Sequence, residues 1–169
     1  MTAIDIREFV ASEADALTEL LHAAYAELGE AGLNFTAVDQ TVATTLHRAS
    51  AGHCLVAWEE GEPIATITMS MPASATLRRM FPQADRDDVA WLNQLAVSQR
   101  ARGRGLAREL WRRGEAWARA QAATVIGVDT AIPASHLVDL YRGWGFEPAG
   151  SIHWDGKTYD SAVLLKDLG

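Results

Sequence analysis

The chain has 169 residues, 49% of them hydrophobic, with 22 Asp and Glu against 15 Lys and Arg for a net charge of −7. This is an ordinary globular composition, the acidic balance argues against a general nucleic-acid binder, and the single cysteine excludes a disulfide framework. The first thirty residues are acidic and do not match a secretory signal, and no apolar run approaches the roughly 18 residues of a membrane span. We therefore expect one domain, residues 1–169, in the reducing environment of the cytoplasm.

The first fifty residues predict one strand followed by two helices. Residues 3–10 alternate apolar and polar side chains, which is typical of a strand. Ser12 begins a helical pattern that Gly29 ends, and Thr36 begins a second one after a loop at 29–35. In both helices an aspartate follows three residues after the first residue, which is the spacing of a capping box.

The middle of the chain predicts a hairpin, a connector and a strand. Apolar, β-rich runs at 53–58 and 64–71 flank the acidic turn 59–63, which contains Gly and Pro. Residues 72–88 are polar and long for a plain connector, so we expect them to help form a site. Residues 89–97 read as the next strand.

The last third predicts two helices and three strands. Apolar residues from Ala107 to Ala118 recur at helical spacing, and a short β-branched strand follows at 124–128. A helix at 135–142 precedes two strand-like runs on either side of the turn 154–157. This order predicts an α/β fold whose mixed sheet is covered by helices on both faces.

The segment between the strand at 89–97 and the following helix carries an unusual charge. Between Gln99 and Arg113 there are six arginines and one glutamate, which leaves the rest of the chain more acidic than the total of −7 indicates. A compact cationic segment indicates a site for an anionic ligand. The alternative is a solvated, arginine-rich helix face.

Glycines in this segment favour a phosphate site at the start of the helix. Gly103 and Gly105 let an anion approach the backbone, and a helix start presents unpaired N–H groups. No lysine followed by Ser or Thr is present, as a Walker A loop requires, and a dinucleotide-binding loop would have three glycines. The pattern indicates a pyrophosphate site without an obligatory metal.

Residues Arg102 to Ala107 fit the motif of Arg or Gln, two residues, Gly, one residue, Gly or Ala, and the chain here resembles the GNAT superfamily of acyl-CoA N-acyltransferases. A second block, 140–147, is similar to the helix of this family that ends in Tyr before Gly-Phe, and residues 154–166 are similar to its terminal hairpin. The resemblance implies a mixed, mostly antiparallel sheet with a central parallel pair.

The resemblance also implies acetyl-CoA as co-substrate, with no metal. Its pyrophosphate would lie on the backbone of Arg102, Gly103, Arg104, Gly105, Leu106 and Ala107, and its pantetheine arm beside Leu95, Ala96 and Val97. Arg100, Arg104 or Arg108 would reach the adenosine phosphates. Many relatives bond the arm through an Asn where this chain has Ala134, and Ser135 is the expected substitute.

The activity implied is transfer of an acetyl group to a primary amine by direct attack in a ternary complex. Tyr141 matches the family's proton donor, although a tyrosine on a helix face is also a common core residue. The strand position where relatives often carry a glutamate base is Trp91. Other titratable candidates for the base are Asp88, His53, His136 and Asp129. We favour a water-mediated proton path, with Asn93 as a residue that holds the water or the substrate.

The acceptor site is expected at the loops 29–35 and 72–88 and the hairpin turn. Its candidate residues are Phe35, Trp91, Asn93 and Trp154, with core packing as the alternative for the two tryptophans. The acidic remainder of the surface favours a cationic small molecule or peptide amine, and the family analogy suggests a homodimer.

Two rival functions follow from the same residues. A catalytically inert acyl-CoA sensor would keep the phosphate site and lack proton chemistry, and retention of Tyr141 argues against it. An RNA-binding Arg-Gly segment would be disordered, repeated and part of a basic chain. We expect neither a nucleic-acid nor a membrane partner.

Overall fold

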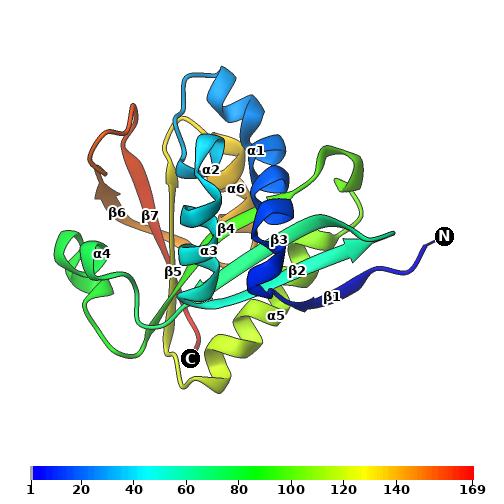
Figure 1. The fold of residues 1–169 in the computed structure, drawn as a ribbon. Coiled ribbons are helices and arrows are strands. Elements are labelled where there is room, and N and C mark those ends of the chain that lie inside the picture. The colour runs from blue at the N-terminus through cyan, green and yellow to red at the C-terminus, as the bar shows by residue number, and fades with distance from the viewer. Residues whose placement is uncertain (1) are drawn as a thin grey trace.

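A computed structural model describes residues 2–169 as a seven-stranded sheet between layers of helices (Figure 1). In chain order the elements are β1 (Asp5–Glu8), η1 (Ala11–Glu13), α1 (Ala14–Glu30), α2 (Thr36–Asp39), α3 (Val42–Ser50), β2 (His53–Glu59), β3 (Glu62–Ser70), α4 (Ala75–Met80), η2 (Pro82–Ala84), β4 (Val89–Val97), η3 (Gln99–Ala101), α5 (Leu106–Ala120), β5 (Val125–Ala131), α6 (Ser135–Gly143), β6 (Glu147–Ile152) and β7 (Ser161–Asp167). The strand order is β1-β2-β3-β4-β5-β7-β6, and only β4 and β5 pair in parallel. The predicted mixed α/β sheet with a central parallel pair is confirmed.

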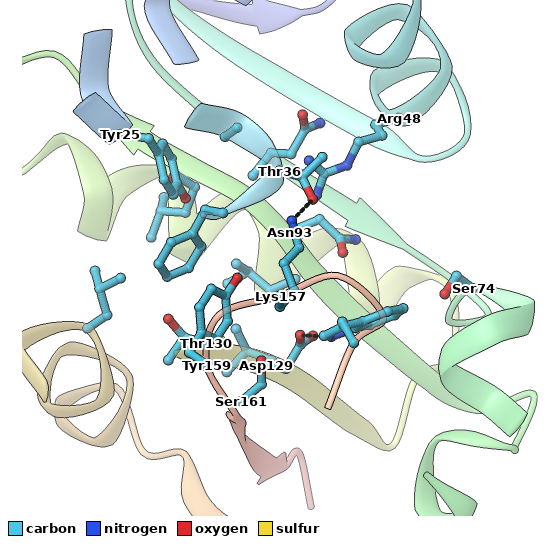
Figure 2. Close-up of a pocket in the computed structure, with 18 of the residues that line it drawn as sticks. Tyr25, Thr36, Arg48, Ser74, Asn93, Asp129, Thr130, Lys157, Tyr159 and Ser161 are labelled. Atoms are coloured by element: carbon cyan, nitrogen blue, oxygen red, sulfur yellow. Dashed lines mark hydrogen bonds between the residues drawn. The ribbon is translucent and has the colours of Figure 1, made fainter. Parts of the chain in front are cut away.

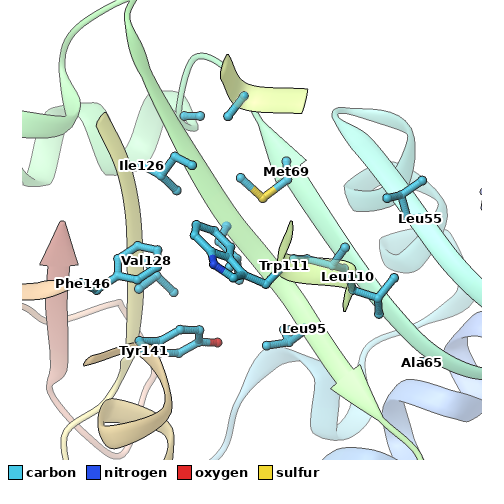
Figure 3. Packing of buried hydrophobic residues seen from close by; sticks show 14 of the residues in the cluster. Leu55, Ala65, Met69, Leu95, Leu110, Trp111, Ile126, Val128, Tyr141 and Phe146 are labelled. Carbon is cyan, nitrogen blue, oxygen red and sulfur yellow. The ribbon is translucent and has the colours of Figure 1, made fainter. Parts of the chain in front are cut away.

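Two apolar layers attach the helices to the sheet. On one face, α1 buries Leu17 and Leu21 and α3 buries Ala49, in one apolar cluster with Val56 of β2. On the other face, the periodic apolar stripe of α5 buries Leu110 and Trp111 beside α6 (Figure 3). The burial of both helix layers confirms the expectation of helices on both faces.

The two predicted capping boxes do not form, and the second predicted helix is divided. The Val10 N–H donates to the Glu13 carboxylate (3.1 Å), and residues 11–13 form a 3-10 turn before α1, so Ser12 is no cap. The second predicted helix divides after α2 at Gln40, whose backbone is extended, and α3 begins anew with Thr41 accepting from the Thr44 N–H (3.1 Å). The break directs the Gln40 side chain inward to Thr45.

The predicted connector at 72–88 contains α4 and η2. Ser74 caps α4 by accepting from the Leu77 N–H (3.3 Å). Leu77 and Phe81 are buried beside the first half of β4, so this segment also completes the core. Within residues 2–169, no helix has the length and apolar character needed to cross a membrane.

The central strands separate after their first three residue pairs. Residues Val89 to Trp91 of β4 pair with Val125 to Gly127 of β5. Beyond these residues the two strands continue but no longer pair with each other. Gln94 has a φ of 48° where the pairing of β4 with β3 shifts, so β4 is also irregular at this level. The divergence leaves room for a site between the two strands.

Candidate active site

The loop between β4 and α5 presents backbone N–H groups without acceptors. Gly103 and Gly105 have φ values of 77° and 79°, and α5 begins after Gly105 without a side-chain cap. Across residues 2–169, the N–H groups of 103–108 find no hydrogen-bond acceptor, and the first bond at this helix end is that from the Glu109 N–H to the Gly105 carbonyl (3.0 Å). A Cβ on either glycine would enter open space, which an anion can occupy instead. We call residues 103–108 the cradle.

Acidic residues from other elements neutralise most arginines near the cradle. Arg104 donates to both oxygens of Glu59 (3.1 and 2.7 Å), which lowers the pKa of that carboxyl to about 2. Arg100 pairs with Glu62 (3.0 Å) and Arg102 with Glu27 (3.3 Å). The exposed Arg108, in the first turn of α5, has no ion pair in the described part of the chain. It is the arginine left free for a bound phosphate.

A cavity of about 490 Å³ lies where β4 and β5 diverge (Figure 2). Its walls come from α1, α2, α3, β4, β5, α6 and the segment before β7. Of the residues predicted for the site, those that line the cavity are Phe35, Asn93, Leu95, Tyr141 and Trp154. These five are spread over more than a hundred positions of the sequence, and the fold brings them together.

Asp129 on β5 is a partly buried carboxylate in the cavity wall. The indole Nε1 of Trp91 donates to its Oδ1 and that of Trp154 donates to its Oδ2, both at 2.8 Å. Burial raises the pKa of Asp129, against the two indole hydrogen bonds that lower it. The two indoles fix the direction of the carboxylate, and each of its oxygens keeps a second lone pair.

Trp91 has a different position from the one predicted. It is 1% exposed and does not line the cavity, so it reaches the site only through its bond to Asp129. Its ring lies over Gly127 of the neighbouring strand, where a Cβ would come within 2.0 Å of the ring. Glycine at this position therefore leaves the space that the indole occupies.

Tyr141 of α6 reaches the opposite wall. The side chain is 5% exposed, packs edge-on against Trp144 and Phe146, and points its hydroxyl toward Leu95 (Figure 3). That hydroxyl has no hydrogen-bond partner within residues 2–169. Burial raises the pKa of Tyr141 well above its ordinary value, so the phenol stays protonated at neutral pH.

The remaining predicted residues lie around these groups. Leu95 is already engaged through its carbonyl, which accepts from the Tyr25 hydroxyl (2.7 Å). Ala96 is buried, Val97 is partly buried, and Ser135 is exposed at the start of α6, outside the cavity lining.

Three of the four alternatives for the base lie away from the cavity. Asp88 bonds Arg86 and Thr124, His53 stacks on Trp117 with ring centroids 5.2 Å apart, and His136 is exposed on α6. None of them lines the cavity, whereas Asp129 does. The best indication in the sequence that Asp129 belongs to a site is its place near the carboxyl end of a parallel strand. Hydrophobic periodicity alone would predict that this side chain faces solvent.

Two cations in the cavity wall were not predicted at all. Arg48 of α3 donates to the Gln40 side chain (2.8 Å), and Lys157 donates to the Asn34 carbonyl (2.7 Å) and the Thr36 hydroxyl (3.2 Å). In Figure 2 the dashed line at Thr36 marks the Lys157 contact. Residues 2–169 hold no cluster of three or more His, Cys, Asp or Glu side chains suited to a metal ion.

The comparison with known families agrees with this geometry. The model of the acetyltransferase (GNAT) family matches residues 14–146. No curated protein matches the chain.

Solved structures share the fold over almost the whole chain. An acetyltransferase of the GNAT family from Streptococcus pneumoniae is 18% identical with a TM-score of 0.72, covering 99% of this chain and 100% of that one. An N-acetyltransferase from Staphylococcus aureus is 18% identical with a TM-score of 0.71, covering 99% of both chains. A Salmonella typhimurium protein assigned as an acetyltransferase, solved with its cofactor acetyl-CoA, is 18% identical with a TM-score of 0.72, covering 99% and 95%.

Proposed function

The chain belongs to the acetyltransferase (GNAT) family, and we propose that it transfers the acetyl group of acetyl-CoA to a primary amine by direct attack in a ternary complex. The observation that carries this proposal is the run of unpaired N–H groups at 103–108, directly after the strand whose divergence from β5 opens the cavity. The relatives named as N-acetyltransferases support an amine acceptor.

The cradle suits the pyrophosphate of acetyl-CoA. The N–H groups of 103–108 and the positive end of α5 attract an anion, and the two glycines leave space for it. Arg108 would add a charge-assisted contact to a phosphate. Leu95, Ala96 and Val97 lead from the cradle to the cavity, so the pantetheine arm would follow them, with Ser135 of α6 as a further polar contact.

The residues of the cavity would manage the protons. Acetyl-CoA supplies an activated thioester; the amine nitrogen forms a bond to its carbonyl carbon as the carbon–sulfur bond breaks. Asp129 accepts the proton that the amine must lose, and the Tyr141 hydroxyl donates a proton to the departing sulfur. Solvent exchange then restores both groups. A base at Asp129 takes the place of the water-mediated proton path favoured from the sequence. Phe35, Asn93 and Trp154, which line the same cavity, surround the acceptor.

A calorimetric titration with acetyl-CoA, desulfo-CoA, ATP and a short RNA tests the co-substrate. We expect micromolar binding of both coenzyme A compounds and none of RNA. Failure of a folded sample to bind acetyl-CoA would refute the proposal. The predicted cytoplasmic location, the single domain and the homodimer stay predictions.

Tyr141→Phe tests the proton donor. We expect turnover to fall by about 100-fold, the lower end of the usual range for a general acid, because the sulfur would leave without a positioned acid, while acetyl-CoA affinity stays unchanged. The readout is steady-state release of free thiol beside calorimetric affinity. Full activity in this variant would remove Tyr141 from the mechanism.

A further inference from the structure

The cavity wall holds two basic side chains without a carboxylate partner. The Arg and Lys residues without an ion pair in the described 2–169 are Arg48, Arg79, Arg108, Arg142 and Lys157. Arg79, Arg108 and Arg142 are exposed, where water screens their charge. Arg48 and Lys157 are partly buried, and both line the same cavity.

Neutral groups accept the hydrogen bonds of Arg48 and Lys157, and no carboxylate pairs with their positive charges. Arg48 bonds a neutral amide, and Lys157 bonds a carbonyl and a hydroxyl. Burial lowers the pKa of both groups, which reflects the loss of water around two neighbouring cations. A desolvated cation without a counter-charge is unfavourable, and an anion bound beside it removes much of that penalty.

The acidic groups near these cations do not neutralise them directly. Asp129 on β5 acts on Arg48 only through space, since no ion pair within 4.0 Å joins them, and its oxygens accept the two indoles. Asp39 of α2 acts on Lys157 in the same way, and the exposed Asp155 lines the cavity rim. The cavity therefore has a cationic side at Arg48 and Lys157 and an anionic side at Asp129 (Figure 2).

We propose that the acceptor is an amine that also carries a carboxylate, an amino acid or a close analogue, with its carboxylate held by Arg48 and Lys157 and its amine beside Asp129. This rests on the proposed acetyltransferase function. The acidic surface predicts a cationic amine as the acceptor, and this proposal restricts that class to amines that also carry a negative charge. The cradle is a separate anion site, because none of residues 103–108 lines the cavity.

The test compares matched acceptors in the acetyl-CoA-dependent release of free thiol. The probes are the standard amino acids, their carboxamides, and the amines that remain when the carboxylate is removed. We expect measurable acetylation of one or more amino acids, with kcat/KM at least about 10-fold above that of the matched carboxamide and amine, as a charge-assisted contact implies.

Variants then locate the carboxylate contact. Arg48→Met and Lys157→Met keep much of the side-chain length without the charge, and each should raise KM for the amino acid by about 10-fold or more while KM for acetyl-CoA stays unchanged. Arg48→Lys should recover part of the loss. Arg79→Met, an exposed cation on α4 without an ion pair, is the matched control and should change neither constant.

The outcomes separate the two proposals. Loss of acetyl-CoA binding in the folded wild-type protein overturns the acetyltransferase function itself. If carboxamides and simple amines are acetylated as well as the amino acids or in place of them, the carboxylate site is wrong and the function stands. Unchanged KM for the amino acid in both Met variants has the same meaning. Acetyl-CoA binding without acetylation of any probe overturns the carboxylate site and favours the acyl-CoA sensor.

Discussion

The cavity lies along the second half of β4, and the cradle lies in the loop that follows this strand. The two sites are built in opposite ways. Backbone groups of six consecutive residues form the cradle. Glycine at positions 103 and 105 leaves open space in front of these groups. Side chains from α1, α2, α3, β4, β5, α6 and the segment before β7 form the cavity. A backbone site depends on few side chains, whereas a site made of side chains can be adapted to one acceptor.

Gly105→Glu should give the largest effect, because it places a bulky anion in the cradle. The residue has a φ of 79°, and its Cβ would enter the space that we assign to a phosphate. We expect the affinity for acetyl-CoA to fall by more than about 100-fold in calorimetry, through lost N–H contacts and charge repulsion. Binding at wild-type strength would show that the cradle is elsewhere.

The control for this variant separates backbone strain from ligand conflict. Gly32, after α1, has a φ of 83° and open space around its Cβ, as Gly105 does, yet it lies outside the cradle. Gly32→Glu should lose a similar free energy of unfolding, about 1–2 kcal/mol, and keep its acetyl-CoA affinity. Equal loss of affinity in both variants would assign the effect to strain.

This difference in construction also explains what the sequence predicted. The cradle is local, so a strand, two glycines and a helix start were enough to find it. Strand 89–97, the hairpin and the terminal helices follow from periodicity for the same reason. Asp129, Arg48 and Lys157 come from three distant elements, and no local sequence pattern indicates that they line one cavity. Trp91 was misplaced because its burial depends on Gly127 in another strand.

Asp129→Asn should give the next largest effect, because it removes the proton acceptor from the cavity. We expect turnover to fall by about 100-fold to 10,000-fold with acetyl-CoA affinity unchanged. One indole would then face an amide NH₂, which costs about 1–3 kcal/mol of folding stability, so the variant must be assayed below its melting temperature. Asp160→Asn, an exposed carboxylate paired with His153, is the control. Wild-type turnover would rule out Asp129 as the base.

Trp91→Phe removes one hydrogen bond to Asp129 without changing a residue that lines the cavity. It tests how far the side-chain site depends on residues behind the cavity wall. The proposed base works as a carboxylate, so activity should fall as pH drops through the pKa of Asp129, which burial raises. Removing one indole donor should raise that pKa further and move the acidic limb of the kcat profile to higher pH. Trp117→Phe, whose indole stacks on His53, should leave the limb in place. An unmoved limb in Trp91→Phe would separate this tryptophan from catalysis.

Glu59→Gln tests the anchor of the cradle and should have the smallest effect, a loss of stability near neutral pH that shrinks as pH falls below 4.5. Arg104 lowers the pKa of Glu59 from 4.5 to about 2, so this pair contributes stability above pH 4.5 that is lost as pH falls toward 2. The glutamine variant lacks this ionisation and should show a flatter decline in melting temperature between pH 5 and pH 2.5, measured by circular dichroism. Parallel declines in both proteins would mean that Arg104 is not held by Glu59. Acetyl-CoA affinity in the variant would then decide whether the freed Arg104 turns to the phosphates, since an arginine without its carboxylate is available to the cradle.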